Sequence, residues 1–289
     1  MFPIDLHVHS NVSDGVDTPE ALVRLAAAVP LSAFALTDHD TVDGVERARL
    51  ACQALGEEAP ELIPGVEISA GYGGRDIHIL GLFVNDQNAS FREALAASRK
   101  RRDDRNEQMA ERFVKAGIPM TLKELSFGDP NAIITRAHFA RYLTEHGITK
   151  DNKDAFDRFL GDTSPFYVPR EYMSPETAVR EIHHAGGLAV LAHPLSYRFS
   201  DGQILAMVRQ LKEQGLDGVE AVYGAYSREQ EATVRELAKR FDLLLSGGSD
   251  YHGSNKPGLM LGTGYGSLCV PYAILTALRE ARKQGNESA

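Results

Sequence analysis

Seven short apolar segments alternate with helical patterns along this chain, and this alternation constrains the fold more than any other feature. The apolar segments are residues 4–8, 32–36, 62–68, 76–84, 188–191, 218–222 and 243–246. After the first segment, Thr18 suits a helix N-cap and Pro19 suits the first helical turn. Strands that alternate with helices are typical of α/β proteins with a parallel sheet. We therefore predict one α/β barrel of about seven strand–helix units.

One stretch does not follow this alternation. The chain has 289 residues, 43% hydrophobic and 25% charged, which is enough for one large domain or a large domain with an insert. Residues 118–168 contain helical pieces and polar loops without a clear strand–helix unit. We therefore predict a barrel built from residues 1–100 and 168–289. A small, mostly helical cap subdomain is predicted at residues 101–167, and a long helix near 88–117 leads into it.

Nine side chains that can bind a metal recur along the chain together with the apolar segments, and most of them lie at the ends of these segments. They are His7, His9, Asp14, His39, Glu67, His78, His193, Asp250 and His252. Catalytic groups of α/β barrels lie at the C-terminal ends of the strands. The sequence therefore predicts that these side chains meet on one face of the barrel.

Imidazole and carboxylate ligands without a thiolate suit zinc, manganese, iron or cobalt. His7 and His9 are two residues apart on a predicted strand, so both rings point to the same side, and Asp250 and His252 share this spacing. Nine ligands are too many for one cation, whereas three ligands per ion fit a cluster of two or three metals. Each residue alone has a structural explanation, such as a turn at Asp14, so the metal site is predicted from the set.

The order of these residues resembles that of the PHP family, the polymerase and histidinol phosphatase phosphoesterases of the amidohydrolase superfamily. The resemblance is carried by Asp5-Leu6-His7-Val8-His9-Ser10, Asp14, Thr37-Asp38-His39-Asp40, Gly65-Val66-Glu67, His78, His193-Pro194 and Ser249-Asp250-Tyr251-His252. It spans nearly the whole chain. It implies a distorted (β/α)7 TIM-like barrel and metal-dependent hydrolysis of a phosphoester.

The family pattern also implies how the ligands are shared among ions. One ion would be held by His7, His9, Glu67 and Asp250, a second by Glu67, His78 and His193, and a third by Asp14, His39 and His252. Two or three divalent ions are implied, with manganese as the expected metal and zinc or iron as alternatives. The nucleophile is expected to be a hydroxide held by the cluster, and no separate catalytic side chain is assigned.

A second set of residues indicates the branch of the family. Thr135-Arg136-Ala137-His138-Phe139-Ala140-Arg141 is similar to the branch that contains 3′,5′-nucleoside bisphosphate phosphatases and the 5′–3′ exoribonuclease ribonuclease AM. Ala137 departs from that pattern, in which proline is usual. The resemblance implies removal of the 3′-phosphate from a nucleoside 3′,5′-bisphosphate, for example conversion of adenosine 3′,5′-bisphosphate to AMP and phosphate. It also allows 5′–3′ exonuclease action on short 5′-phosphorylated RNA or DNA.

Six residues are predicted to bind this nucleotide: Arg136, His138, Arg170, Lys256, Asp14 and His39. A guanidinium binds phosphate through two parallel hydrogen bonds, so Arg136 with His138 is expected at the 5′-phosphate. The alternative for this pair is a structural arginine and a cap histidine. Phe166 or Tyr167 is a candidate to stack on the base, with core packing as the alternative.

The basic run Arg99–Arg105 is interrupted by Asp103 and Asp104, and this mixture predicts a solvated helix face. The alternative is that Arg99, Arg102 and Asn106, which share one helical side, line the mouth of the site. Two other functions also stay open. A histidinol-phosphate phosphatase is disfavoured by the Arg136 segment, and a non-catalytic metal- or RNA-binding module is disfavoured by the complete ligand set.

Charge and hydropathy exclude several classes of protein. A formal net charge of −9 argues against a surface that coats nucleic acid. No apolar run of 18 residues and no secretory signal pattern is present, so we expect neither a membrane span nor export. Cys52 and Cys269 lack ligand spacing and are predicted to be unpaired thiols. We expect a cytoplasmic enzyme with no obligate protein partner.

Overall fold

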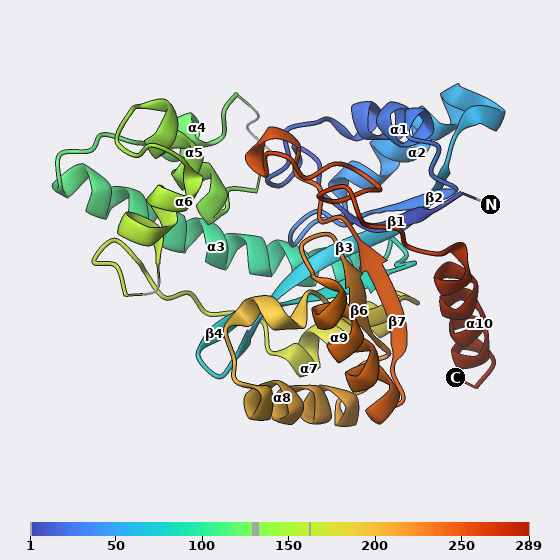
Figure 1. Cartoon of the computed structure of the whole chain (residues 1–289). Coiled ribbons are helices and arrows are strands. Elements are labelled where there is room, and N and C mark those ends of the chain that lie inside the picture. The colour runs from blue at the N-terminus through green and yellow to red at the C-terminus, as the bar shows by residue number, and fades with distance from the viewer. Residues whose placement is uncertain (1, 129–132, 162, 289) are drawn as a thin grey trace.

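The computed structural model describes residues 2–128, 133–161 and 163–288, and within them it contains the seven predicted strands (Figure 1). The strands are β1 (Ile4–Val8), β2 (Ala33–Leu36), β3 (Glu61–Tyr72), β4 (Arg75–Leu82), β5 (Leu188–Leu191), β6 (Gly218–Tyr223) and β7 (Leu244–Gly248). They form one sheet in which the order of the strands is their order in the sequence.

The sheet nearly closes on itself between β1 and the segment that follows β7. The backbone N–H of Asp250 donates to the carbonyl oxygen of His7 (2.9 Å), and that of His9 donates to the carbonyl oxygen of Tyr251 (3.0 Å). The buried carboxylate of Asp5 accepts hydrogen bonds from the backbone N–H and the hydroxyl of Ser249. The predicted α/β barrel is therefore confirmed, and its closure brings the ends of the first and last strands together.

The middle of the sheet differs from a regular series of strand–helix units. β3 and β4 form an antiparallel hairpin, and β4 is also antiparallel to β5. Gly73 and Gly74 turn this hairpin with φ values of 57° and 76°, a conformation that favours glycine. The expectation that the candidate ligands lie where strands end is wrong for Glu67, because β3 continues to Tyr72. The hairpin instead places Glu67 and His78 on the same face of neighbouring strands.

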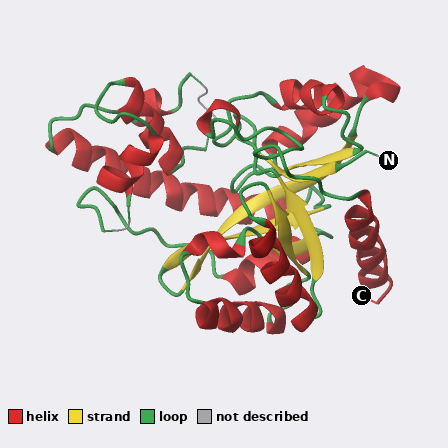
Figure 2. Cartoon of the chain, viewed as in Figure 1, coloured by secondary structure: helices red, strands yellow, loops and turns green. Residues whose placement is uncertain are grey.

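Helices cover the outside of the barrel (Figures 1 and 2). They are α1 (Pro19–Ala28), α2 (Asp43–Leu55), α7 (Pro175–His184), α8 (Asp201–Glu213), α9 (Arg228–Arg240) and α10 (Tyr272–Ser288), with the short segments η1 (Gly56–Glu58), η3 (Pro194–Tyr197) and η4 (Gly253–Asn255). As predicted, Thr18 caps α1 by accepting a hydrogen bond from the backbone N–H of Ala21. Buried aliphatic side chains fill the barrel interior and the layer beneath the helices. No described helix is both long and apolar enough to cross a membrane.

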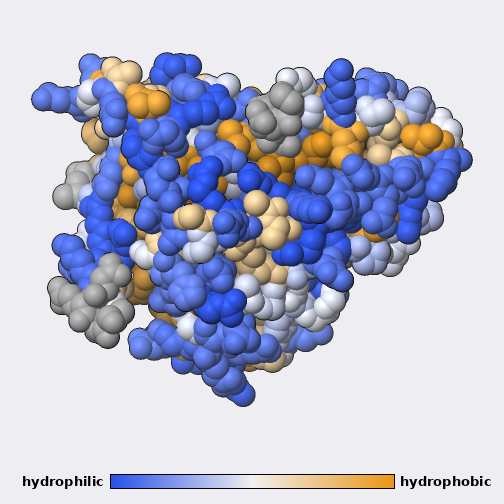
Figure 3. Space-filling view, turned by 180° about the vertical axis from the view of Figure 1, so that it is seen from behind, coloured by the Kyte–Doolittle hydropathy of each residue, from blue (hydrophilic) through white to orange (hydrophobic). Residues whose placement is uncertain are grey.

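A group of helices between β4 and β5 packs beside the barrel (Figure 1). They are α3 (Ala89–Lys115), α4 (Leu122–Leu125), α5 (Arg136–Glu145), α6 (Asn152–Ala155) and the π-helical segment η2 (Phe156–Leu160). They share a hydrophobic cluster that includes Met109, Phe113 and Phe139. We call residues 101–167 the cap; its boundaries stay a prediction, and residues 129–132 and 162 lie outside the described part of the chain. Seen from behind, the surface is mostly hydrophilic, with a hydrophobic band in its upper half (Figure 3).

Candidate metal and phosphate site

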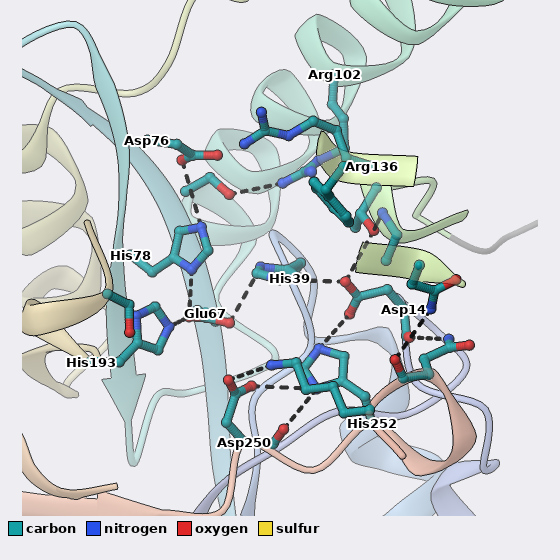
Figure 4. A pocket seen from close by; sticks show the side chains of 18 of the residues that line it. Asp14, His39, Glu67, Asp76, His78, Arg102, Arg136, His193, Asp250 and His252 are labelled. Carbon is teal, nitrogen blue, oxygen red and sulfur yellow. Dashed lines mark hydrogen bonds and ion pairs between the residues drawn. The ribbon is translucent and has the colours of Figure 1, made fainter. Parts of the chain in front are cut away.

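One pocket of about 430 Å³ lies between the strand ends of the barrel and the cap. Seven of the nine predicted ligand residues line it: Asp14, His39, Glu67, His78, His193, Asp250 and His252. Figure 4 shows these side chains converging from opposite sides of the pocket. The other two, His7 and His9, are completely buried and lie deeper.

Four ligand atoms from three distant segments meet at the bottom of this pocket. His7 Nε2 lies 3.1 Å from His9 Nε2 and 3.2 Å from Glu67 Oε2. His9 Nε2 lies 3.0 Å from the same glutamate oxygen, and both imidazole nitrogens lie 3.5 Å from Asp250 Oδ1. Ligands at about 2.1 Å from one tetrahedral ion would be roughly 3.4 Å apart. The spacing of the four atoms therefore suits one cation between them.

The carboxylate of Glu67 faces a second group of ligands with its other oxygen. Glu67 Oε1 lies 2.8 Å from His78 Nδ1 and 3.1 Å from His193 Nε2. Burial alone would raise the pKa of Glu67, but the imidazoles of His78, His7 and His39 hold it well below its ordinary value. An ionised carboxylate with one oxygen in each group is placed to bridge two cations.

Asp14 gathers a third group on the side of the pocket nearest the cap. Its Oδ1 lies 3.1 Å from His252 Nε2 and 3.6 Å from His9 Nδ1, and its Oδ2 lies 3.7 Å from His39 Nε2. One ligand atom from each of His9, Asp14, His39 and His252 lies within 4.8 Å of the others. The fold therefore brings all nine predicted ligand residues together.

The unpartnered nitrogens of this cluster fit a metal centre. Among the described residues, four buried imidazole nitrogens make no hydrogen bond of acceptable geometry: His9 Nδ1, His39 Nδ1, His78 Nδ1 and His193 Nδ1. Buried polar atoms are normally hydrogen-bonded, so such atoms need another partner. Three of these nitrogens lie within 3.6 Å of carboxylate oxygens. Imidazoles and carboxylates in this arrangement form a donor set that suits divalent transition metals.

Two residues outside the predicted set hold ligands in place. Glu220, completely buried on β6, pairs with His7 Nδ1 (3.0 Å) and accepts a hydrogen bond from the backbone N–H of His193 (2.9 Å). This leaves His7 Nε2 facing the ligand cluster. Thr135, the N-cap of α5, donates its hydroxyl hydrogen to Asp14 Oδ2 (3.0 Å). The sequence offered one signal for Glu220, namely a glutamate in the middle of an apolar strand.

Backbone strain is concentrated at the same place. His193 and Asp250 have φ values of 26° and 58°, and Asp40, next to His39, has 51°. Residues other than glycine adopt this left-handed region at an energetic cost, and such positions cluster at functional sites. The surrounding structure holds two of the predicted ligands in conformations that they would not adopt freely.

A wall of arginines faces the ligand groups across the pocket (Figure 4). Three arginines line the pocket and form what we call the arginine wall: Arg102, Arg105 and Arg136. Arg102 is paired with Asp40 at 2.5 Å. Arg105 differs, because no carboxylate among the described residues forms an ion pair with it, and the one hydrogen bond that its guanidinium makes there goes to Met109 Sδ, at 3.5 Å. Burial and the neighbouring guanidinium groups lower its pKa to about 9, so it remains charged at neutral pH. A buried cation without a counter-charge marks a place where an anion is stabilised.

The predicted solvated face of the Arg99–Arg105 run is wrong at two positions. Arg102 and Arg105 are each only 4% exposed, because this side of α3 is covered by the barrel and the cap. Arg99 instead pairs with Asp43 (2.6 Å) outside the pocket lining. The signal for this burial was present in the apolar positions of the same helix, since Phe91, Leu95, Met109 and Phe113 are buried together with Arg102 and Arg105.

Four of the six residues predicted to bind substrate line the pocket: Asp14, His39, Arg136 and Lys256. His138 and Arg170 lie outside this lining. His138 Nδ1 accepts a hydrogen bond from the backbone N–H of Thr135 in a capping box, and burial lowers its pKa to about 4. Arg170 stacks over the ring of Tyr172 (4.4 Å) and lies 3.6 Å from Asp40. The neutral, capping ring of His138 matches the structural alternative for this residue.

The two aromatic candidates for base stacking are already in contact with protein groups. Phe166 stacks on Phe113 at 4.3 Å and 12° within the cap, as the core-packing alternative predicts. The guanidinium of Arg136 lies 5.6 Å above the ring of Tyr167. Neither Phe166 nor Tyr167 belongs to the pocket lining.

Comparison with known proteins adds an independent finding. Residues 5–242 match the PHP domain family. The chain is 38% identical over 251 residues to a 5′–3′ exoribonuclease of Haemophilus influenzae, covering 86% of this chain and 89% of that protein. It is 34% identical over 263 residues to a 3′,5′-nucleoside bisphosphate phosphatase of Chromobacterium violaceum, covering 91% of each. An amidohydrolase of C. violaceum, solved with bound sulfate and no metal, superposes with a TM-score of 0.85 at 33% identity, covering 97% of this chain and 96% of that one.

Proposed function

The chain belongs to the PHP domain family and is a hydrolase of phosphoester bonds, and on this premise we propose that it removes the 3′-phosphate from nucleoside 3′,5′-bisphosphates. The observation that carries the proposal is the guanidinium of Arg105, which faces the ligand cluster across one pocket and forms no ion pair with a described carboxylate. The cluster suits the reacting phosphate, and the arginine wall suits a second phosphate of the same molecule. The C. violaceum relative named for this substrate is 34% identical.

We assign the nine ligand residues to two or three divalent cations, with manganese as the expected metal. The groups are His7, His9, Glu67 and Asp250; Glu67, His78 and His193; and Asp14, His39 and His252. When bound, such cations supply a hydroxide nucleophile at neutral pH and neutralise charge on the reacting phosphate. The protein holds the ligands rigidly through contacts such as that of Glu220 with His7.

The arginine wall would act on the phosphate that does not react. Arg102, Arg105 and Arg136 donate hydrogen bonds in fixed directions, which suits the 5′-phosphate. Binding energy from that phosphate positions the 3′-phosphate beside the ligand cluster. Lys256 and Tyr223 both donate to Asp250 Oδ2, at 2.5 and 2.7 Å, and stand at the edge of the cluster where a phosphate oxygen would approach.

Exonuclease action is a second candidate that uses the same geometry. In a 5′-phosphorylated oligonucleotide, the 3′-oxygen of the first nucleotide is linked through phosphorus to the next nucleotide. Hydrolysis of that phosphorus–oxygen bond releases a 5′-mononucleotide, and the 5′-phosphate is placed as in the bisphosphate. The relative from H. influenzae, 38% identical, is named as a 5′–3′ exoribonuclease.

Two assays of the manganese-loaded protein test the proposal: release of phosphate from the phosphate monoesters, and release of a 5′-mononucleotide from the RNA. Their substrates are adenosine 3′,5′-bisphosphate, 3′-AMP, a short 5′-phosphorylated RNA and histidinol phosphate, and we expect the bisphosphate or the RNA to react fastest. Arg105→Met should raise KM for the bisphosphate by about 10- to 150-fold, since a hydrogen bond to a charged group is worth roughly 1.5–3 kcal/mol. Turnover of 3′-AMP should change little.

Arg99→Met is the matched control, because Arg99 lies on the same helix and pairs with Asp43 outside the pocket lining. It should leave both KM values unchanged. Arg136→Ala should act in the same direction as Arg105→Met. Faster hydrolysis of histidinol phosphate by the parent protein, or equal KM effects of the Arg105 and Arg99 variants, would contradict the proposal.

A further inference from the structure

We propose that Phe156 is the platform on which the base of the bound nucleotide stacks. Phe156 is the first residue of η2 in the cap, is 37% exposed and lines the same pocket as the ligand residues and the arginine wall. The inference rests on the proposed function, because it assigns a contact to the base of the proposed nucleotide substrate in addition to the contacts of its two phosphates. It also assigns a role to the cap.

The other phenylalanines of this part of the cap are used to build its core. Phe113 stacks on Phe166 at 4.3 Å, and Phe159 packs against both at 6.1 and 5.5 Å. Phe156 has no such neighbour, because no aromatic ring of the described residues contacts it. A ring that is 37% exposed on a pocket wall leaves apolar surface in water, and a base lying on it would remove that surface from water.

The position of Phe156 suits the shape of a nucleotide. The pocket of about 430 Å³ carries ligand residues such as Glu67 on one wall, Arg105 on another and Phe156 at the cap. A nucleoside bisphosphate offers two phosphates and a base, which are two anions and one flat apolar surface. Single-turn π-helical segments such as η2 are frequent at functional sites.

The residues beside Phe156 predict little discrimination among bases. Asn152 and Asn255 also line the pocket, but their amide groups already donate to backbone carbonyl oxygens. Asn152 Nδ2 donates to the carbonyl oxygen of Asn255 (3.4 Å), and Asn255 Nδ2 donates to that of Asp14 (2.8 Å). Stacking accepts every base, because each base has a π-face. We therefore expect the four nucleobases to bind with similar affinity.

Equilibrium binding tests the platform without requiring turnover. Calorimetry of the full chain compares AMP with ribose 5-phosphate, which carries the same 5′-phosphate and lacks the base. Phe156→Ala should weaken AMP binding by about 5- to 100-fold, as expected for loss of stacking on one base, and leave ribose 5-phosphate binding unchanged. Phe156→Tyr keeps a ring and should restore AMP binding.

Tyr265→Ala is the matched control, because Tyr265 is an exposed aromatic residue (59%) outside the pocket lining. It should bind both ligands as the parent does. Circular dichroism checks that each variant is folded, and Phe156→Leu replaces the alanine variant if the latter is not. The platform is refuted if the parent binds AMP no more tightly than ribose 5-phosphate, or if loss of the ring weakens both ligands equally. Failure of the phosphate-release assay with AMP binding intact would overturn the proposed reaction alone.

Discussion

Replacing Glu220 by glutamine should weaken metal binding although Glu220 is not itself a proposed ligand. Its two oxygens pair with His7 Nδ1 (3.0 Å) and with the backbone N–H of His193 (2.9 Å), so one carboxylate orients two ligand residues. A glutamine side chain has one acceptor and one donor. Whichever way it turns, an NH₂ group faces an N–H group, and either His7 rotates or the segment of His193 shifts.

The expected size of the effect follows from the chemistry of the ring. Burial would lower the pKa of His7, yet the carboxylates of Glu220, Glu67 and Asp250 raise it well above its ordinary value. The negative charge around the ring therefore strongly favours a positive charge at this position. Loss of a carboxylate that supports a ligating histidine typically costs 10- to 100-fold in metal affinity. That range corresponds to about 1.4–2.8 kcal/mol.

Calorimetric titration of metal-free protein with manganese measures this loss directly. Asp217→Asn is a matched control, because Asp217 also pairs with one histidine ring and one backbone N–H. These are His183 Nε2 at 2.8 Å and the N–H of Ala189 at 2.7 Å. The control should lower stability without changing metal affinity. The reasoning fails if Glu220→Gln binds manganese as tightly as the parent, or if both variants lose affinity equally.

Two further predictions concern stability. Because the folded pKa of His138 is about 4, below the ordinary 6.5, the unfolded chain binds more protons between these values. Stability should therefore fall, by on the order of 3 kcal/mol, as pH drops from about 6.5 to about 4. His138→Gln retains a residue that can complete the capping box and should reduce this slope in urea unfolding at several pH values; an unchanged slope would refute the assignment. Gly248→Ala should lower stability by about 1–3 kcal/mol, because its Cβ would lie 2.5 Å from the backbone nitrogen of His7. Gly202→Ala, with nothing within 4 Å of its Cβ, is the control and should not destabilise.

Local patterns were sufficient to predict the barrel and the candidate ligands. Apolar runs of four to nine residues predict strands wherever they occur, and ligands such as His7 and His193 stand where such runs end. Because parallel strands present the same end to one edge of a sheet, position along the chain translates into position in space. The reversal of β4 was not predicted, although the short glycine-containing turn at residues 71–74 leaves no room for the crossover helix that a parallel pair needs.

The sequence by itself determined the barrel and the set of residues that can gather at one end of it, because strand periodicity is a local property. Only the tertiary structure decided that Arg105 pairs with no carboxylate among the described residues, that Glu220 supports His7 and that the ring of Phe156 faces the pocket. Each of these roles depends on which side of an element is covered by a segment distant in the chain. The apolar positions around Arg105 and Glu220 indicate that these side chains are buried, but the groups that they meet depend on the packing of distant segments, which no local pattern encodes.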